Sequence, residues 1–218
     1  DPPLAAYLMQ FADSPLLRGG RQGMSMRDLL ARLGTRQLND LVLGFTVRHL
    51  FASRETILQQ AFALRWRRAR ERAAYCAALA QRCSLALDDA MLAGLLQDIG
   101  SLPLLDELQH WPDFPREMAA LDELCDQLSA DIGALVLTRW QLPAAVIECA
   151  RQRGQWQRQH EGAADLTDLV LVASALQADA ATLLEPLPAQ KRLGLQQPLA
   201  ELREALRPEL QLWLRLLA

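Results

Sequence analysis

The stretch from Met91 to Gly100 constrains the fold more than any other part of the sequence. Its apolar residues recur at the three- and four-residue spacing of one helix face, and they are Met91, Leu92, Leu95, Leu96 and Ile99. Ala93 and Gly94 make the opposite face small and apolar as well, so we expect this helix in the middle of a domain. It ends with Gln97 and Asp98, and an unpaired charge is costly to bury. The sequence therefore predicts a partner for the Asp98 carboxylate inside the core.

Residues at both ends of this stretch resemble helix-end signals. Asp88 and Asp89 precede it, and their carboxylates could accept hydrogen bonds from the free N–H groups of a first turn. Gly100 follows it, and glycine often ends a helix because it tolerates a left-handed backbone. We therefore expect a central helix that the two aspartates cap and Gly100 closes.

Helical spacing recurs along the whole chain, whereas the alternation typical of strands is nearly absent. The clearest helix covers about residues 55 to 83. Shorter helices are expected over residues 2–11, 25–34, 35–49, 117–128, 129–140, 143–154 and 166–184, with a further short one between 103 and 115. Ser129 is the expected cap of the helix that begins there. The sequence thus predicts an all-α fold of about ten helices around one core.

Two segments are expected along the chain. Residues 1–185 form one helical domain, and residues 186–218 form a C-terminal helical extension packed on it, in which prolines separate two or three short helices. The last apolar residues occupy more than one helix face, which favours burial in the core over a partner surface. The chain starts with Asp1 rather than Met, so we also expect a piece of a longer protein.

Composition argues against several classes of function. The chain is 51% hydrophobic and 22% charged, so it can bury a sizeable core. Its net charge of -3 gives no bulk attraction for nucleic acid or an anionic membrane, and no apolar run is long enough to span a bilayer. The four cysteines include no Cys-x-x-Cys pair, which favours buried, reduced thiols of a cytoplasmic protein. Neither nucleic acid nor membrane is therefore expected as a partner.

Several segments, taken together and in order, carry a resemblance to a known family. They are residues 1–15, 31–51, 64–66, 93–100 and 132–143, and the last two contain Leu-Leu-Gln-Asp-Ile-Gly and Trp-Gln-Leu-Pro. Over about residues 1 to 185 the chain resembles the HDOD domain, a degenerate relative of the HD metal-dependent phosphohydrolases. The resemblance implies an all-helical bundle. It also implies a place in a bacterial signalling protein, where such domains are often fused to receiver, kinase or cyclic-dinucleotide-related domains.

The departures from the enzyme pattern concern its metal ligands. HD enzymes hold one or two metal ions with imidazoles and carboxylates, and the ions activate water for attack on phosphate. The resemblance places Arg68, Gln97, Ser129 and Arg153 where the pattern has histidines, and it retains one carboxylate, Asp98. A single carboxylate beside an amide cannot hold a divalent ion against water. We therefore expect no catalysis, no bound metal and no cofactor.

Two further positions and the histidines agree with this interpretation. Gly154 stands where the pattern has the second histidine of a pair, and its last carboxylate would fall near Leu176. The histidines of the chain lie at none of the ligand positions, and they are His49, His110 and His160. The remnant pocket thus consists of Arg68, Gln97, Asp98, Ser129 and Arg153.

An arginine is the expected partner of Asp98, because guanidinium is always charged and its planar fork suits a carboxylate. The resemblance brings Arg68 to the same former site, so we predict that Arg68 reaches Asp98 in place of the lost cation. Three alternatives remain open at this point. The pair can serve only to hold the fold, Arg68 and Arg153 can form an anion or nucleotide pocket, or Arg68 can point to solvent.

Arg68 belongs to a dense run of basic residues on the long helix. The run comprises Arg65, Arg67, Arg68, Arg70 and Arg72. At 100° per residue these side chains spread around the helix and make no single stripe. A solvated face, paired with acids on the same or neighbouring helices, is therefore favoured over a phosphate-binding patch.

Together these observations favour a non-catalytic regulatory domain that transmits a signal through protein contacts. The expected partner is another protein or the fused domains of a longer bacterial, cytoplasmic signalling protein, and a homodimer stays an open alternative. A nucleotide- or anion-binding sensor that uses Arg68 and Arg153 is the second hypothesis. A residual metal-dependent phosphohydrolase is the third.

Overall fold

Two compact units divide the chain. Residues 51–214 form one unit, and residues 1–50 with 215–218 form the other. The computed structural model describes residues 53–178 and 186–217, and almost all of these belong to the first unit. The helices predicted within residues 2–49 lie outside the described residues.

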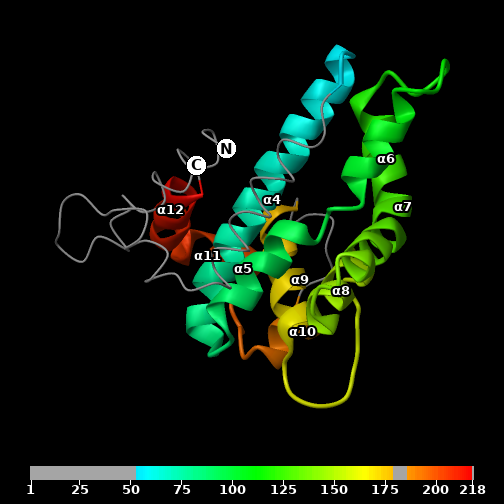
Figure 1. The fold of residues 1–218 in the computed structure, drawn as a ribbon. Coiled ribbons are helices and arrows are strands. Elements are labelled where there is room, and N and C mark those ends of the chain that lie inside the picture. Colours follow the sequence, from blue (N-terminus) through cyan, green and yellow to red (C-terminus); the bar gives the residue numbers. More distant parts are fainter. Residues whose placement is uncertain (1–52, 179–185, 218) are drawn as a thin grey trace, which may run out of the picture. The chain divides into compact units, whose positions relative to one another are not determined.

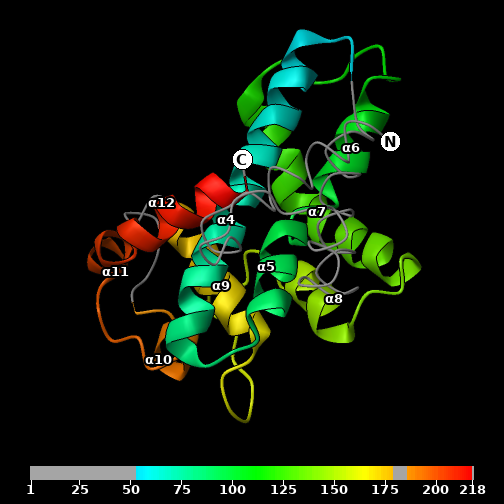
Figure 2. The same cartoon turned by 60° about the vertical axis from the view of Figure 1, so that its left-hand side comes forward.

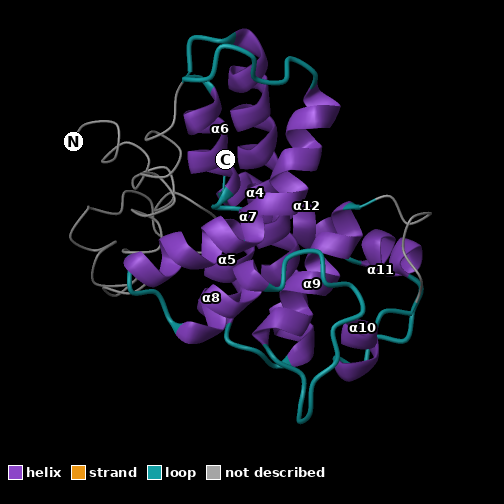
Figure 3. Cartoon of the chain, turned by 90° about the vertical axis from the view of Figure 1, so that its right-hand side faces the viewer, coloured by secondary structure: helices purple, strands orange, loops and turns teal. Residues whose placement is uncertain are grey.

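The described part of the chain is helical throughout and contains no strand (Figure 3). Its helices are α4 (Thr56–Cys83), α5 (Leu87–Leu96), α6 (Ser101–Leu108), α7 (Met118–Arg139), α8 (Ala144–Arg151), α9 (Leu166–Gln177), α10 (Pro188–Arg192), α11 (Leu199–Ala205) and α12 (Arg207–Leu216). The all-α fold class is therefore confirmed. The described residues hold fewer helices than the roughly ten predicted for the whole chain. Among them, no helix combines the length and apolar character needed to cross a membrane.

The core is built around α4, which packs against α5, α6, α7 and α9 (Figures 1 and 2). Every residue of α4 from Ala73 to Ala80 is buried, and most of these residues are alanines. Their small side chains let neighbouring helices approach closely. A Cβ atom at Gly94 of α5 would stand 2.7 Å from the Cys76 sulfur and 3.0 Å from the Ala73 Cα atom, so α5 needs glycine at this crossing.

The central helix differs from its prediction at both ends. It begins at Leu87 with Ala86 as its capping residue, so Asp88 and Asp89 lie within its first turn rather than before it. There their charges still complement the helix dipole. The helix ends at Leu96, and Gln97 to Gly100 form a turn that leads directly into α6. The predicted helix stop at Gly100 is therefore wrong.

Gly100 is needed for a different reason from the one predicted. Its φ of -66° lies in the ordinary right-handed region, where any residue is allowed. A Cβ atom at Gly100 would overlap the carbonyl oxygen of Ser129 and the backbone nitrogen of Gly133, both on α7. The turn after α5 thus lies against the backbone of α7, and this contact fixes the position of Asp98 relative to α7.

The two helices predicted over residues 117–140 are one continuous helix, α7. Ser129 lies in its middle and does not cap it, because the Ser129 hydroxyl donates a hydrogen bond to the carbonyl of Cys125 four residues earlier. A serine inside a helix commonly satisfies its hydroxyl in this way. Sequence alone did not distinguish this arrangement from a cap.

The remaining helices complete the unit. α8 packs on α5, α7 and α9, while α10 and α11 pack on α9. The predicted helix over residues 166–184 is confirmed as far as Gln177, and residues 179–185 lie outside the described part. The tail contains three short helices, and Arg82 of α4 forms an ion pair with Glu209 of α12 at 2.9 Å.

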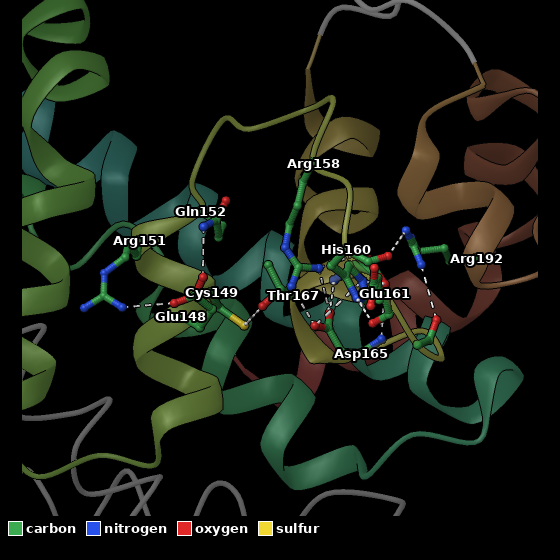
Figure 4. Close-up of polar contacts among 12 residues, drawn as sticks. Glu148, Cys149, Arg151, Gln152, Arg158, His160, Glu161, Asp165, Thr167 and Arg192 are labelled. Carbon is green, nitrogen blue, oxygen red and sulfur yellow. Dashed lines mark hydrogen bonds and ion pairs between the residues drawn. The ribbon is translucent and has the colours of Figure 1, made fainter.

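The cysteines are free, as expected for reduced thiols. Cys76, Cys125 and Cys149 are buried, and Cys83 is half-buried. Burial raises the pKa of Cys149 to about 12, although a contact with the Thr167 hydroxyl lowers it in part (Figure 4). Such a thiol stays protonated and is a poor nucleophile.

Candidate functional site

Asp98 lies in the turn between α5 and α6, and only 7% of its surface is exposed. The turn is held from both sides. The hydroxyl of Ser101 donates to the Asp98 carbonyl at 2.7 Å, and Gly100 packs against the backbone of α7. The carboxylate is therefore buried, as the sequence predicted, and the turn that carries it is held by contacts on both sides.

Each oxygen of the Asp98 carboxylate accepts a hydrogen bond from a different arginine. Arg72 of α4 donates from Nη1 to Oδ2 at 3.0 Å, and its Nε donates to the Gly94 carbonyl at 2.8 Å. Arg153, in the turn after α8, donates from Nε to Oδ1. The carboxylate is thus clamped between two guanidinium groups from distant parts of the sequence.

These charges decide the ionisation of the site. Burial by itself raises the pKa of Asp98, but the positive charges of Arg72 and Arg153, with a smaller contribution from Arg65, hold it well below its usual range. For Arg153, burial lowers the pKa, and Asp98 and Asp126 more than reverse this effect, so the guanidinium stays protonated. Asp98 is therefore an ionised carboxylate that its neighbours neutralise.

Two acids of α7 extend the network towards the surface. Arg153 donates from Nη2 to Oδ1 of Asp126 at 2.8 Å, and Asp126 is largely exposed. Arg65 of α4 is buried and forms an ion pair with Asp122. Ion pairs therefore link α4 to α7 directly, and also link α7 through Arg153 to the α5–α6 turn.

The predicted pair between Arg68 and Asp98 is wrong. The Arg68 side chain is 42% exposed, and its ion pair is with Asp122, 3.7 Å away. Arg72 takes the predicted role because it lies one helical turn further along α4, level with Gly94 and the end of α5. The idea that a guanidinium faces this carboxylate is confirmed, but for different arginines: Arg72 and the other predicted pocket residue, Arg153.

The other predicted pocket residues bind elsewhere. Oε1 of the Gln97 side chain accepts a hydrogen bond from the Ser174 hydroxyl of α9 at 2.6 Å, and Nε2 of the same side chain donates to the backbone carbonyl of Cys149 at 3.4 Å. The Ser129 hydroxyl bonds within α7, to the Cys125 carbonyl. Leu176, near which the last carboxylate of the enzyme pattern was expected, is a buried core residue. Asp98 and Arg153 are thus the two of the five predicted residues that contact each other, and Arg68 reaches only the edge of this network, through Asp122.

Sequence reasoning missed Arg65 and Arg72, which it assigned to a solvated face. Both are buried, and both fall on the stripe of α4 that faces the core. That stripe includes Leu58, Ala61, Phe62, Arg65, Ala69, Arg72, Ala73 and Cys76. The signal was therefore available, because both arginines fit the three- and four-residue spacing of the apolar positions on this stripe.

A second cluster of charges lies where the loop after α8 meets the start of α9 (Figure 4). Asp165 caps α9 by accepting from the Asp168 N–H at 2.9 Å, and Asp168 accepts in return from the Asp165 N–H at 3.1 Å. This reciprocal capping box satisfies two backbone groups of the first turn. Arg158 donates to Asp165 at 2.7 Å and to Asp168 at 3.0 Å. His160 lies 2.9 Å from the second oxygen of Asp168.

This second cluster has the residue types of a metal site. One potential ligand atom from each of His160, Asp165 and Asp168 lies within 4.8 Å of the others. The guanidinium of Arg158, however, donates to both carboxylates, so a positive charge already stands where a metal ion would be held. We therefore assign this cluster to the anchoring of the loop rather than to metal binding.

The comparisons with known proteins agree with the resemblance seen in the sequence. The family model of the HDOD domain matches residues 1–155. The chain belongs to the HDOD domain family. A search of curated proteins found no match.

Two crystal structures of proteins from Shewanella amazonensis share the fold of this HDOD domain. One, named "Putative metal-dependent phosphohydrolase", is 21% identical with a TM-score of 0.78, and the match covers 99% of this chain and 80% of that one. The other, named "Putative phosphohydrolase", is 20% identical with a TM-score of 0.64, and the match covers 100% and 84% of the two chains. At this level of identity the likeness establishes the fold alone.

The side chains around Asp98 do not provide the ligands that the metal ion of an HD enzyme needs. A divalent ion needs several oxygen or nitrogen ligands that are free to bind it. Both Asp98 oxygens accept from arginines, and the Gln97 amide is engaged by Ser174 and the Cys149 carbonyl. Arginine offers donors only, so Arg72 and Arg153 cannot be ligands. The residues around Asp98 are therefore suited to an internal ion-pair network and not to a divalent ion.

Proposed function

We propose that this HDOD domain is a non-catalytic regulatory domain that transmits a signal through protein contacts in a bacterial, cytoplasmic signalling protein. The observation that supports this proposal is the pair of guanidinium groups on Asp98, one on each carboxylate oxygen. In the HD pattern the equivalent carboxylate is a metal ligand, whereas here its bonding capacity is used within the fold.

The remaining groups are also poorly suited to hydrolysis. A general base works best when its pKa lies near the working pH. The pKa of Asp98 lies well below its usual range, because two arginines outweigh the effect of burial. Arg72 and Arg153 cannot accept a proton. The site can thus hold charges in place, but it lacks a group that could activate water.

A hydrolysis screen tests the catalytic part of this proposal. The purified chain is incubated with Mn²⁺ or Mg²⁺ and with p-nitrophenyl phosphate, nucleotides and cyclic dinucleotides, beside the Asp98→Asn variant. We expect no turnover that distinguishes the two proteins. Turnover in the wild type that disappears in Asp98→Asn would restore the third hypothesis, a metal-dependent phosphohydrolase.

A binding experiment tests the protein-contact part. A protein that co-purifies with the tagged chain is purified separately and titrated against it, with and without a metal chelator. We expect saturable binding that the chelator leaves unchanged. Arg68→Ala serves as a matched surface control, because Arg68 is partly exposed and outside the Asp98 cluster.

A second candidate function, binding of an anion such as a nucleotide, is favoured by one observation. Within the described part of the chain, Nη2 of Arg72 is buried and has no hydrogen-bond partner. Unpaired buried donors are costly, and an anion could meet them. Calorimetry with phosphate, nucleotides and cyclic dinucleotides would decide: a saturable signal that Arg153→Ala abolishes supports this candidate, whereas the first proposal predicts none.

A further inference from the structure

The imidazole of His160 has a hydrogen-bond acceptor at each of its two nitrogens. Nδ1 lies 3.0 Å from the carbonyl oxygen of Glu161, and Nε2 lies 2.9 Å from Oδ2 of Asp168. A neutral imidazole carries only one N–H, whereas the protonated ring carries two. Both contacts can therefore be hydrogen bonds at the same time only when His160 is protonated.

The acceptor on the α9 side is fully buried. Asp168 has no exposed surface, and its carboxylate needs complete compensation. Its Oδ1 accepts from Arg158, while its Oδ2 accepts from the Asp165 N–H and faces His160. A proton on Nε2 of His160 thus completes the set of donors around this carboxylate.

The charged groups that face His160 come from three elements. On the loop, Arg158 opposes a positive charge on the ring, whereas the Glu161 carbonyl favours it. At the start of α9, Asp168 is the main attraction, and Asp165 lies 3.9 Å from Nε2. From α10, Arg192 donates to the backbone carbonyls of His160 and Gly162.

We propose that His160 is a proton-operated clasp that holds the loop between α8 and α9, residues 152–165, against α9. In the protonated state, Nε2 donates to Asp168 and Nδ1 donates to the Glu161 carbonyl. When the proton leaves, the ring keeps the N–H that faces the carboxylate, which is the stronger acceptor. The bond to the Glu161 carbonyl is then lost, and the bond to Asp168 loses the positive charge of its donor, so both the turn at Glu161 and the attachment of the loop to α9 weaken.

This clasp adds a form of control to the proposed function without depending on it. Arg153 lies near the start of the same loop, and its guanidinium donates to the Asp98 carboxylate. Arg192 ties the middle of the loop to α10. A change of pH through the pKa of His160 would therefore alter a segment that connects the central ion pairs to the surface of α9 and α10.

The direction of the pH effect is set by the environment of the ring. The hydrogen bond to Asp168, then the backbone bond to Glu161, raise the pKa of His160 above its ordinary value of 6.5. A group whose pKa is raised by folding contributes stability below the unfolded value and loses it as the pH rises through the folded value. The clasp is thus strongest below the pKa of His160 and weakens as the pH rises through it.

Histidine NMR of the full chain tests the clasp. Substitutions His49→Gln and His110→Gln assign the signals, and His110 serves as the exposed control. We expect His160 to titrate above 6.5 and Asp168→Asn to return its pKa towards that value. At high pH, ¹⁵N shifts should report the N–H on Nε2, a result that needs no substitution at Asp168. A wild-type pKa at or below 6.5, or the opposite tautomer, would overturn the proposal.

Hydrogen exchange tests the loosening of the loop. Exchange of the amides in residues 155–165 is corrected for intrinsic rates and compared between wild type and His160→Gln on both sides of the measured pKa. We expect extra protection in the wild type at low pH that disappears at high pH. An equal pH profile in the two proteins would show that the ring does not control the loop.

Discussion

The molecule contains two arginine–aspartate clusters that use the same chemistry in different ways. At Asp98, the carboxylate is buried and two arginines reach it from 26 and 55 residues away in sequence. At the start of α9, by contrast, Arg158 reaches Asp165 and Asp168 from seven and ten residues away, and a histidine is the additional partner. The first cluster joins remote helices, whereas the second holds a loop to the helix that comes after it.

The difference teaches what each cluster can do. Breaking a buried pair leaves an uncompensated charge in the core, so the Asp98 cluster can hardly change without cost to the whole fold. The second cluster contains the one described histidine that faces a buried carboxylate. Its strength can therefore change with a single proton while the core stays intact. We regard the first cluster as a fixed structural element and the second as adjustable.

The largest effect is expected for Arg72→Met. It leaves Asp98 with one guanidinium and opens the buried network, so we expect the free energy of unfolding to fall by about 3–5 kcal/mol in urea denaturation. Arg68→Met on the same helix is the matched control. Because Arg68 is partly exposed and 3.7 Å from its acid, its effect should stay within about 0.5 kcal/mol. Similar losses for both variants would contradict the assignment of Arg72.

Gly100→Ala should have the next largest effect, because it pushes the Asp98 turn away from α7. A Cβ atom there meets backbone atoms that cannot move aside, and overpacking of this kind costs about 1–3 kcal/mol. Gly133→Ala probes the other side of the same contact. Its Cβ would meet its nearest atom at 3.3 Å, so thermal unfolding should show a smaller loss. An equal loss of stability for Gly133→Ala and Gly100→Ala would contradict the prediction that an added methyl group clashes severely only at Gly100.

Asp165→Ala removes the cap of α9 and one partner of Arg158. Loss of a cap costs about 0.5–2 kcal/mol, so we expect less destabilisation than for Arg72→Met. The change should also be local, with faster hydrogen exchange in the loop and the first turn of α9 only. Faster exchange in α4 and α5 would argue that the two clusters are energetically one.

The sharpest contrast, and for His160 the smallest effect, concerns the dependence of stability on pH. Folding lowers the pKa of Asp98 below its ordinary 3.8, so its stabilisation is present above that value and is lost as the pH falls. Folding raises the pKa of His160, so its contribution is lost as the pH rises. Urea denaturation at several pH values gives the difference in free energy of unfolding between wild type and each variant. This difference should shrink in acid for Asp98→Asn and in alkali for His160→Gln. If both differences shrank in the same direction of pH, the two clusters would not have the opposite pH dependence that we predict.

Much of the fold could be predicted from the sequence because helix periodicity is a local property. The long helix α4, the helical tail and the burial of Asp98 all follow from the spacing of apolar residues. The join of two predicted helices into α7 could not be foreseen, because a serine hydroxyl favours a cap but can also bond to the carbonyl four residues earlier inside a helix, as Ser129 does. Gly100 was misassigned for a similar reason, since the sequence does not reveal which backbone it touches.

The candidate site was predicted in kind but not in detail. Charge balance requires a cation beside a buried carboxylate, and this reasoning led to an arginine. Whether Arg68 or Arg72 supplies it depends on how α4 crosses α5, and that crossing is set by Gly94 and the alanines of α4. The surroundings of His160 depend on the path of a loop, for which sequence periodicity gives no guide.

Binding of Mn²⁺ to the full chain, measured by calorimetry in wild type and Asp98→Asn, tests the central claim most directly. The claim is that Arg72 and Arg153 each occupy one oxygen of the Asp98 carboxylate, which leaves that carboxylate unable to bind a metal ion. We predict no stoichiometric site whose occupancy depends on Asp98, whatever weak binding other acids contribute. One equivalent of bound metal that Asp98→Asn abolishes, and that His160→Gln leaves intact, would contradict the account.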